Sequence, residues 1–435
     1  MRLNQLYRIT ILFTTGLILF GTPIYSQSPN EVIGKLVGGD DLFELQKQHR
    51  QLKDSIIPML DYLSESVLAT AFNQSEKGIK ALDILLGSES FQQQLGPSNI
   101  TNLTMLHANL CEDGYHYKEA AEVLQSFLEK TKSEDLGQMR PLIQQKLEIN
   151  LILAEQAPMR VTRLSKDCEI RYNLENTGRG QSLFVEAKIN GKALPMIFDT
   201  GCPKYNFISE RVAKEFGITK LVDSIPLTGV GKGFAWIGIA DSLSLGDVTC
   251  YNPLFYIAQE TAADSVHGAD AVLGADLFNA LGEVQFYPEK KKIVFPVNLT
   301  ALPASGHNMV MKNRQPYLKL NQKGKSMLMH FDTGNVKTYM TPLFYKANSS
   351  LVEELGVKDS LRIGGFGGVS VHKSYRLPFL SFELAGTNFK LPNLDVSTEG
   401  AMEMWCESGV LGVDFIQQFT RIIVSYKDMF VKIEN

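Results

Sequence analysis

The feature that most constrains the fold of this chain is a strand-type sequence that occurs twice in its second half. Residues 184–198 read FVEAKINGKALPMIF, and residues 317–331 read YLKLNQKGKSMLMHF. In both copies an aromatic residue lies fifteen positions, and a turn glycine eight positions, before an aspartate. Short alternating runs around turn residues are typical of β-structure. A repeat that extends over more than 100 residues predicts two copies of one β-domain, from about 168 to 300 and from 306 to 435.

Three motifs follow one another in the same order in each copy. Asp-Thr-Gly comes directly after the repeated run, a glycine-rich segment follows, and two apolar residues then precede a further glycine. In the first copy they are Asp199-Thr200-Gly201, Gly229–Gly233 and Val272-Leu273-Gly274, and in the second they are Asp332-Thr333-Gly334, Gly364–Gly368 and Val410-Leu411-Gly412. The gap from the aspartate to the last glycine is 75 residues in one copy and 80 in the other. Two ordered sets are far more specific than one isolated tripeptide.

This arrangement resembles the retropepsin-type aspartic peptidases, with two halves fused in one chain as in the pepsin-like enzymes. The resemblance covers roughly residues 180–435. It implies a bilobal β-barrel fold with Asp199 and Asp332 as the catalytic pair at the base of a cleft, and an active site that needs no homodimer. It implies active-site support by Thr200, Gly201, Thr333, Gly334, Gly274 and Gly412. It also implies flaps that cover an extended polypeptide substrate, with Gly229, Gly231, Gly233, Gly364, Gly365 and Gly367 in them.

The chemistry of such a pair follows from electrostatics. Two carboxylates about 3 Å apart cannot both ionise cheaply, so they share one proton and titrate as a coupled pair. The ionised member can take a proton from a water that attacks a peptide carbonyl, and the protonated member can donate to the developing oxyanion. Glycine lets the backbone approach the carboxylates, and Thr200 and Thr333 can hydrogen-bond across to the opposite loop. No cofactor and no metal is expected.

Three residues near the aspartates depart from the family or add a titratable group. The residue after Asp-Thr-Gly is Cys202 in one copy and Asn335 in the other, where the family usually has Ala, Ser or Thr. We interpret Cys202 as a buried thiol, with redox-sensitive activity as the alternative. His330, two residues before Asp332, is interpreted as a packing residue, and a shifted pH range of the pair is the alternative.

Other chemistries have little support in the sequence. The histidines form no HExxH motif, the cysteines form no CxxC motif, and no G-x-S-x-G elbow occurs. Gly229–Gly233 lacks the GxGxxG spacing of a dinucleotide loop, and Asp276 and Asp414 are interpreted as structural caps. The remaining rival is a non-catalytic peptide-binding module that keeps the fold. Retention of both complete Asp-Thr-Gly motifs favours hydrolysis, because binding alone would not require them.

The first 26 residues predict a signal peptide. Arg2 and Arg8 precede an apolar run from Ile9 to Phe20, which at twelve residues is too short to span a bilayer. Small Ser26 offers a cleavage site, so we expect export to the periplasm or the extracellular space, with an uncleaved anchor as the alternative. No later segment approaches a membrane-spanning length. A net charge of −4 gives no electrostatic basis for binding nucleic acid.

Between the signal peptide and the β-repeats, residues 27–160 predict a helical domain. Apolar residues recur at helical spacing, and two pairs of helices are offset by 39 residues. The segment resembles tetratricopeptide helical hairpins, although Ser75 and Gly78 depart from that motif. A generic helical bundle is the alternative. The fold class is therefore multidomain α plus all-β, and the helical domain is either a protein docking surface or an inhibitory prosegment.

Overall fold

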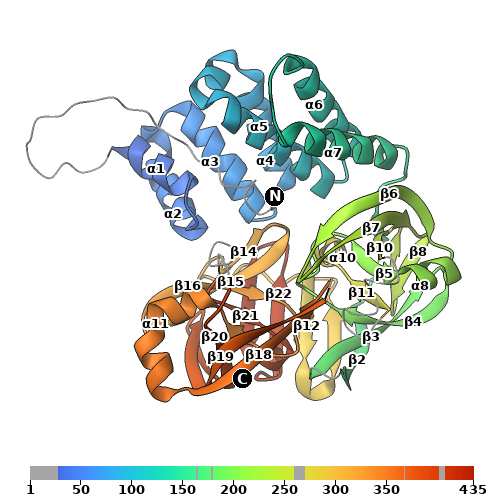
Figure 1. The fold of residues 1–435 in the computed structure, drawn as a ribbon, viewed down its shortest axis with the longest axis vertical. Coiled ribbons are helices and arrows are strands. Elements are labelled where there is room, and N and C mark those ends of the chain that lie inside the picture. Colours follow the sequence, from blue (N-terminus) through green and yellow to red (C-terminus); the bar gives the residue numbers. More distant parts are fainter. Residues whose placement is uncertain (1–27, 163–164, 178–179, 259–269, 367, 401–406) are drawn as a thin grey trace, which may run out of the picture. The chain divides into compact units, whose positions relative to one another are not determined.

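The computed structural model describes residues 28–435, with gaps at 163–164, 178–179, 259–269, 367 and 401–406. The chain divides into two units, Met1–Gln156 and Ala157–Asn435. The described part of the first unit is helical, and the second is rich in β-strands (Figure 1). The predicted signal peptide and the flap residue Gly367 lie outside the described residues.

The first unit is built from helices around one apolar core. Its core is formed by leucines such as Leu63, Leu82, Leu103 and Leu124, all fully buried. At Gly96 the backbone leaves the helical conformation, with a φ of 75°, just before Pro97. The helices are α1 (Pro29–Val37), α2 (Leu42–Leu52), η2 (Lys53–Ser55), α3 (Pro58–Ala71), α4 (Ser75–Gly87), α5 (Glu89–Asp113), α6 (Tyr117–Lys130) and α7 (Met139–Ala154).

Gly78 permits close packing of three helices in this unit. A Cβ atom at Gly78 of α4 would lie 2.5 Å from Leu110 Cδ1 of α5 and 3.0 Å from Ala69 Cβ of α3. The glycine that departs from the tetratricopeptide motif therefore has a packing reason. Among the helices that the structure describes, none combines the length and apolar character needed to cross a membrane.

The second unit consists mainly of two sheets. The first sheet holds β1–β13 together with β22 and β23, and the second holds β14–β21. The strands up to residue 295 are β1 (Arg160–Thr162), β2 (Cys168–Asn176), β3 (Gln181–Ile189), β4 (Lys192–Phe198), β5 (Asn206–Ser209), β6 (Thr219–Thr228), β7 (Lys232–Ile239), β8 (Ser242–Leu245), β9 (Val248–Tyr251), β10 (Leu254–Ala258), β11 (Ala271–Leu273), β12 (Glu283–Tyr287) and β13 (Lys292–Phe295). The later strands are β14 (Met309–Lys312), β15 (Gln315–Gln322), β16 (Lys325–Phe331), β17 (Tyr339–Met340), β18 (Val357–Gly365), β19 (Gly368–Leu384), β20 (Thr387–Ser397), β21 (Gly409–Leu411), β22 (Arg421–Ser425) and β23 (Phe430–Glu434). Short helices accompany them, namely α8 (Glu210–Glu215), α10 (Ala275–Leu281), η3 (Pro288–Lys290), α11 (Pro342–Leu355) and α12 (Val413–Ile416).

The repeated sequence corresponds to a repeated pattern of strand pairing. The β3–β4 hairpin is matched by the β15–β16 hairpin. In the first copy β11 runs parallel to β4 and antiparallel to β5, and in the second β21 runs parallel to β16 and antiparallel to β17. The register also agrees, because Leu273 is paired with Phe198 and Leu411 with Phe331. Each apolar pair before a bracing glycine therefore lies beside the strand that leads into an aspartate.

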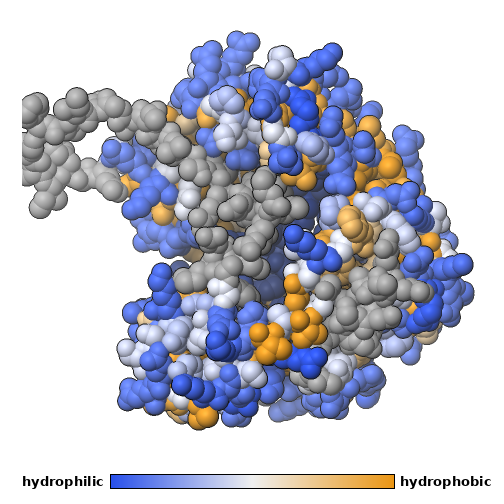
Figure 2. All heavy atoms as spheres, in the orientation of Figure 1, coloured by the Kyte–Doolittle hydropathy of each residue, from blue (hydrophilic) through white to orange (hydrophobic). Residues whose placement is uncertain are grey.

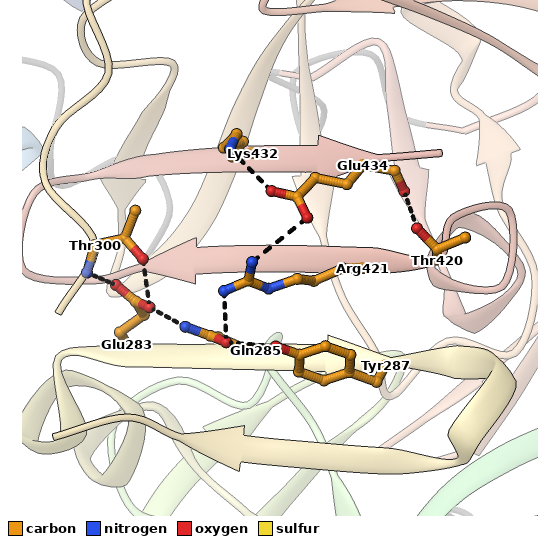
Figure 3. A network of polar contacts seen from close by, with 8 residues as sticks. All are labelled: Glu283, Gln285, Tyr287, Thr300, Thr420, Arg421, Lys432 and Glu434. Atoms are coloured by element: carbon orange, nitrogen blue, oxygen red, sulfur yellow. Dashed lines mark hydrogen bonds and ion pairs between the residues drawn. The ribbon is translucent and has the colours of Figure 1, made fainter. Parts of the chain in front are cut away.

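Strands from the two copies also meet in one sheet. β12 pairs with β22 on one side and with β13 on the other, and β13 in turn pairs with β2. Figure 3 shows a polar network on this sheet, in which the Arg421 guanidinium donates to Gln285 Oε1 at 2.9 Å and also contacts Glu434. The fully buried Glu283 carboxylate accepts hydrogen bonds from Gln285 Nε2 and from the backbone and hydroxyl of Thr300. The hydrogen bond from Arg421 to Gln285 connects the two copies far from their aspartates in sequence.

Candidate active site

Asp199 and Asp332 are the first residues after two buried strands. β4 ends at Phe198 and β16 at Phe331, and both phenylalanines are fully buried. Phe198 stacks on Phe278 of α10 with ring centroids 4.5 Å apart, and Phe331 contacts Phe415 of α12 edge-on. Aromatic packing of this kind holds the end of each strand in place. The two aspartates therefore begin loops whose starting points are fixed.

The two threonines bind the loops to each other through four hydrogen bonds. Thr200 N donates to Thr333 Oγ1 and Thr333 N donates to Thr200 Oγ1, both at 3.0 Å. The Thr200 hydroxyl then donates to Phe331 O at 2.8 Å, and the Thr333 hydroxyl donates to Phe198 O at 2.5 Å. Both side chains are almost fully buried. The arrangement is reciprocal, as the sequence predicted for these residues.

Gly201 and Gly334 allow each loop to lie against the opposite carboxyl group. A Cβ atom at Gly201 would lie 2.4 Å from Asp332 Cγ, and one at Gly334 would lie 2.5 Å from Asp199 Cγ. Real Cβ atoms do not approach other heavy atoms this closely. Any side chain at either position would displace the carboxyl group of the other copy. Gln315 adds a further contact between the copies, because its Nε2 donates to Gly201 O at 2.6 Å.

The Asp199 and Asp332 carboxyl groups lie close enough for Asp332 to act on the pKa of Asp199. Asp199 is buried, with 9% of its surface exposed. Burial raises the pKa of the Asp199 carboxyl well above its usual range, and the charge of Asp332 raises it further. The backbone N–H groups of Gly201 and Cys202 oppose this increase. The pair therefore retains a proton at pH values where an exposed aspartate would have lost it.

The bracing glycines lie directly beneath these loops. A Cβ atom at Gly274 would lie 2.2 Å from Tyr205 O, and one at Gly412 would lie 2.7 Å from the Lys337 carbonyl carbon. Only glycine fits such close backbone contacts.

Two polar residues that the sequence analysis missed complete the bracing. Gly274 N donates to Asn206 Oδ1 at 3.1 Å, and Gly412 N donates to Thr338 Oγ1 at 3.0 Å. These polar side chains lie seven residues after Asp199 and six after Asp332. This similar but not identical spacing after each Asp-Thr-Gly was the signal that could have identified them.

The two glycine-rich segments are the tips of β-hairpins that touch each other. One hairpin is β6–β7 and the other is β18–β19. Gly231 N donates to Phe366 O at 2.9 Å, and a Cβ atom at Gly229 would lie 2.8 Å from the same oxygen. The Phe366 ring contacts Phe207 of the first copy, with ring centroids 5.6 Å apart. A tip of the second copy thus reaches over to the first.

Three other predicted flap glycines, Gly233, Gly364 and Gly365, lie in the same hairpins. Gly233 pairs with Leu227, and Gly364 pairs with Val369. A Cβ atom at Gly365 would lie 2.8 Å from Val230 Cγ2 of the opposite tip.

The hairpins also present apolar side chains on the surface. Phe234 of β7 and Val371 of β19 are 52% and 67% exposed. Figure 2 shows hydrophobic side chains gathered on the surface where the β18–β19 hairpin runs in Figure 1.

The residues that depart from the family differ in their contacts. The Cys202 thiol donates to Tyr205 O at 3.5 Å and packs against Ile197 and Val272, and burial raises the pKa of this thiol well above its usual value. Asn335 instead donates from Nδ2 to Asp332 Oδ2. The buried His330 stacks on Tyr317 with ring centroids 5.0 Å apart. Its Nε2 has no hydrogen-bond partner among the described residues.

The remaining acidic and sulfur-containing groups have structural contacts. Asp414 Oδ1 accepts hydrogen bonds from the backbone and hydroxyl of Thr338, so it braces the segment after Asp332, whereas the N-terminus of α12 has no side-chain cap hydrogen bond. In the described part of the chain, no three His, Cys, Asp or Glu side chains gather as they would around a metal ion. The cysteines that the structure describes are all free thiols, while Cys406 lies outside the described residues. They are Cys111, Cys168, Cys202 and Cys250.

Comparison with known proteins supports an aspartic protease-like family. A sequence model of the family described as aspartyl protease matches residues 185–277, which include the first Asp-Thr-Gly and its bracing glycine. No curated protein matches the chain. A solved structure of edgp is 8% identical, with a TM-score of 0.38 over 62% of this chain and 95% of the other. A retropepsin-like aspartic protease from Rickettsia conorii is 15% identical, with a TM-score of 0.22 over 32% of this chain and 93% of the other.

Proposed function

We propose that this chain is an aspartic endopeptidase, which hydrolyses peptide bonds with a water molecule activated between Asp199 and Asp332. The proposal is supported above all by the two interacting carboxyl groups, which lie on loops held together by Thr200 and Thr333. Such a pair can hold one proton and leave one carboxylate free to accept another. The family match at residues 185–277 supports the same class of reaction.

The reaction needs a proton acceptor and a proton donor on one carbonyl group. The ionised carboxylate takes a proton from water, whose oxygen attacks the carbonyl carbon of the peptide. The protonated carboxyl group donates to the carbonyl oxygen as negative charge develops there. Burial of Asp199 removes this carboxyl group from bulk water, which strengthens its electrostatic interactions. Both carboxyl groups come from one chain, so no homodimer is required.

The proposed substrate is a polypeptide in an extended conformation. The hairpins β6–β7 and β18–β19 meet at Gly231 and Phe366, and such tips can close over a bound chain. An extended peptide offers backbone N–H and C=O groups to a neighbouring hairpin, and alternate side chains to apolar pockets. The contact between the tips must open before a peptide enters. Hairpins from both copies would then hold the substrate.

The place of action and the role of the helical unit belong to the same proposal. The predicted signal peptide supports export to the periplasm or the extracellular space. The helical unit is proposed either to dock a partner protein or to inhibit the peptidase as a prosegment. If residues 30–158 are inhibitory, their deletion raises the activity, and an unchanged or lower activity contradicts inhibition.

The proposed function is tested by cleavage of a diverse peptide library between pH 3 and 8. The full chain is compared with Asp199→Asn and Asp332→Asn, which retain the size of each side chain but remove its acid–base function. If the unmodified chain cleaves peptides and neither variant does, the result supports Asp199 and Asp332 as the catalytic pair. Cleavage that persists in either variant overturns it. If no variant cleaves but all bind the same peptides, the chain is a non-catalytic peptide-binding module.

A further inference from the structure

The two aspartates differ in the side chains that donate hydrogen bonds to them. Each receives a matching backbone hydrogen bond, from Gly201 N to Asp199 Oδ1 at 2.8 Å and from Gly334 N to Asp332 Oδ1 at 2.9 Å. Asp332 Oδ2 also accepts from Asn335 Nδ2. In the first copy the corresponding residue is Cys202, whose thiol donates to a backbone carbonyl instead. The two glycine donors are therefore symmetric. The backbone N–H of Cys202 also acts on Asp199, and the Asn335 side chain donates to Asp332 alone.

This asymmetry determines which carboxyl group holds the shared proton. A carboxylate that accepts hydrogen bonds on both oxygens is stabilised in its ionised form, whereas a protonated carboxyl group must donate from one oxygen. The Asn335 amide can face a carboxylate only with its N–H group, because its own oxygen would repel the negative charge. We propose that Asn335 is a positioning residue that keeps Asp332 ionised, so that Asp199 is the partner that carries the proton. This inference rests on the proposed peptidase function for its catalytic meaning.

The neighbouring titratable groups do not compensate for this difference. Cys202 interacts electrostatically with both carboxyl groups, Tyr339 with Asp332, and Tyr426 with Asp199. Burial raises the pKa of all three groups, so they stay neutral through the acidic range. His330 lies two residues before Asp332, but its ring stacks on Tyr317. Among the described side chains, Asn335 is therefore the one whose hydrogen bond distinguishes the two aspartates.

The assignment fixes the direction of each proton transfer. As water attacks, an O–H bond of water breaks, its proton passes to Asp332, and its oxygen forms a bond to the carbonyl carbon. Asp199 gives its proton to the carbonyl oxygen, so the pair still holds one proton, now on Asp332. When the C–N bond breaks, the leaving nitrogen takes that proton, and one hydroxyl of the intermediate returns a proton to Asp199. The pair ends in its starting state.

The test compares pH profiles of kcat/KM for the full chain, Asn335→Ala and Asn335→Asp. The acidic limit is the pH below which activity falls because Asp332 takes up a proton. Both variants remove the donor to ionised Asp332, so this limit is expected to rise by about one to two pH units. Asn335→Asp also adds a negative charge and is expected to cause the larger rise. The basic limit reports proton loss from Asp199 and is expected to stay in place in Asn335→Ala. Cys202→Ala, at the equivalent position of the other copy, is the control and is expected to move neither limit.

An acidic limit that does not move, or a basic limit that moves in its place, overturns the proposal. The same assignment is tested without any substrate by NMR titration of aspartate carboxyl carbons in the full chain, with Asp199→Asn and Asp332→Asn used to identify the two signals. The pH midpoint of the lower titration step of the pair is expected to rise in Asn335→Ala and to stay unchanged in Cys202→Ala. An unchanged step in Asn335→Ala overturns the proposal. A shifted step in a chain that cleaves no peptide supports the proton assignment and contradicts the peptidase function.

Discussion

Thr200 and Thr333 lie 133 residues apart in the sequence, yet each donates its backbone N–H to the hydroxyl of the other at 3.0 Å. Each hydroxyl in turn donates to the carbonyl group that precedes the opposite aspartate. The two loops thereby form one closed hydrogen-bonded unit, and a shift of either loop breaks bonds of both. The separation of the two carboxyl groups is therefore set by the threonines as much as by the strands.

Replacing Thr200 with valine tests this unit, because valine has nearly the same shape but no hydroxyl. The change leaves Thr333 N–H and Phe331 C=O without their partner in a buried place. We expect a loss of about 1–3 kcal/mol in the free energy of unfolding, together with a fall in kcat. Urea unfolding and peptide cleavage measure the two effects. Thr200→Ser keeps the hydroxyl, and a serine variant as unstable as the valine variant would show that the hydrogen bonds are not responsible.

Gly201→Ala is expected to reduce activity with little change in the fold as a whole. The new Cβ atom would lie 2.4 Å from Asp332 Cγ, so the carboxyl group must move. A displacement of about 1 Å at a reacting group costs on the order of 100-fold in rate, and we expect a fall of that size in kcat. Gly87→Ala is the matched control, because a Cβ atom there meets nothing within 4 Å. Similar losses in both variants would contradict a specific effect on the carboxyl pair.

The raised pKa of Asp199 predicts how stability depends on pH. An unfolded aspartate titrates near pH 3.9, and the folded group titrates at higher pH because burial disfavours its charge. Between these two values the folded chain binds more protons than the unfolded chain, so its stability falls as the pH rises. The contribution of this proton is fully present below about pH 3.9 and is lost as the pH passes the folded pKa.

Asp199→Asn removes this dependence, since the amide does not titrate. We expect the variant to lose less stability than the unmodified chain between pH 4 and 7, with slopes that differ by up to about 1.4 kcal/mol per pH unit. Urea unfolding at several pH values measures both slopes. Parallel curves for the two proteins would show that Asp199 is not titrating with a raised pKa.

Much of the site could be predicted from the sequence because its motifs are local. Asp199, Gly201 and the apolar pair before Gly274 each belong to a short segment with a characteristic pattern, and the repeat indicated that each has a counterpart. The structure brings Asp199 and Asp332 together and places Gly274 and Gly412 beneath their loops. Their catalytic role stays a prediction.

Other contacts depend on distances that no local pattern encodes. Gln315 reaches Gly201 across 114 residues, and β12 of the first copy pairs with β22 of the second. Such contacts depend on how the two sheets pack, and many polar side chains could have filled the same place. Asn335 is a contrasting case. The sequence shows that its residue type is unusual at this position, but only the structure shows that its side chain points to Asp332 and donates a hydrogen bond to it.

The contact between the hairpin tips gives the last prediction. Phe366 contributes its carbonyl oxygen to Gly231 N–H and its ring to Phe207, so it joins the second hairpin to the first copy at two points. Phe366→Ala retains the carbonyl group and removes the ring. Loss of an edge-to-face aromatic contact costs about 0.5–1.5 kcal/mol, and this contact must open before a peptide enters, so we expect KM for peptide cleavage to fall roughly 2- to 10-fold while kcat changes less.

Phe379→Ala is the control within the same hairpin, because Phe379 of β19 is 50% exposed and contacts Lys390 of β20. It is expected to leave KM unchanged. A KM that changes equally in both variants would mean that the hairpin responds to any loss of apolar surface. If KM instead rises in Phe366→Ala, the Phe366 ring contributes to the substrate-bound state, and the closed arrangement of the hairpins is not a barrier to binding.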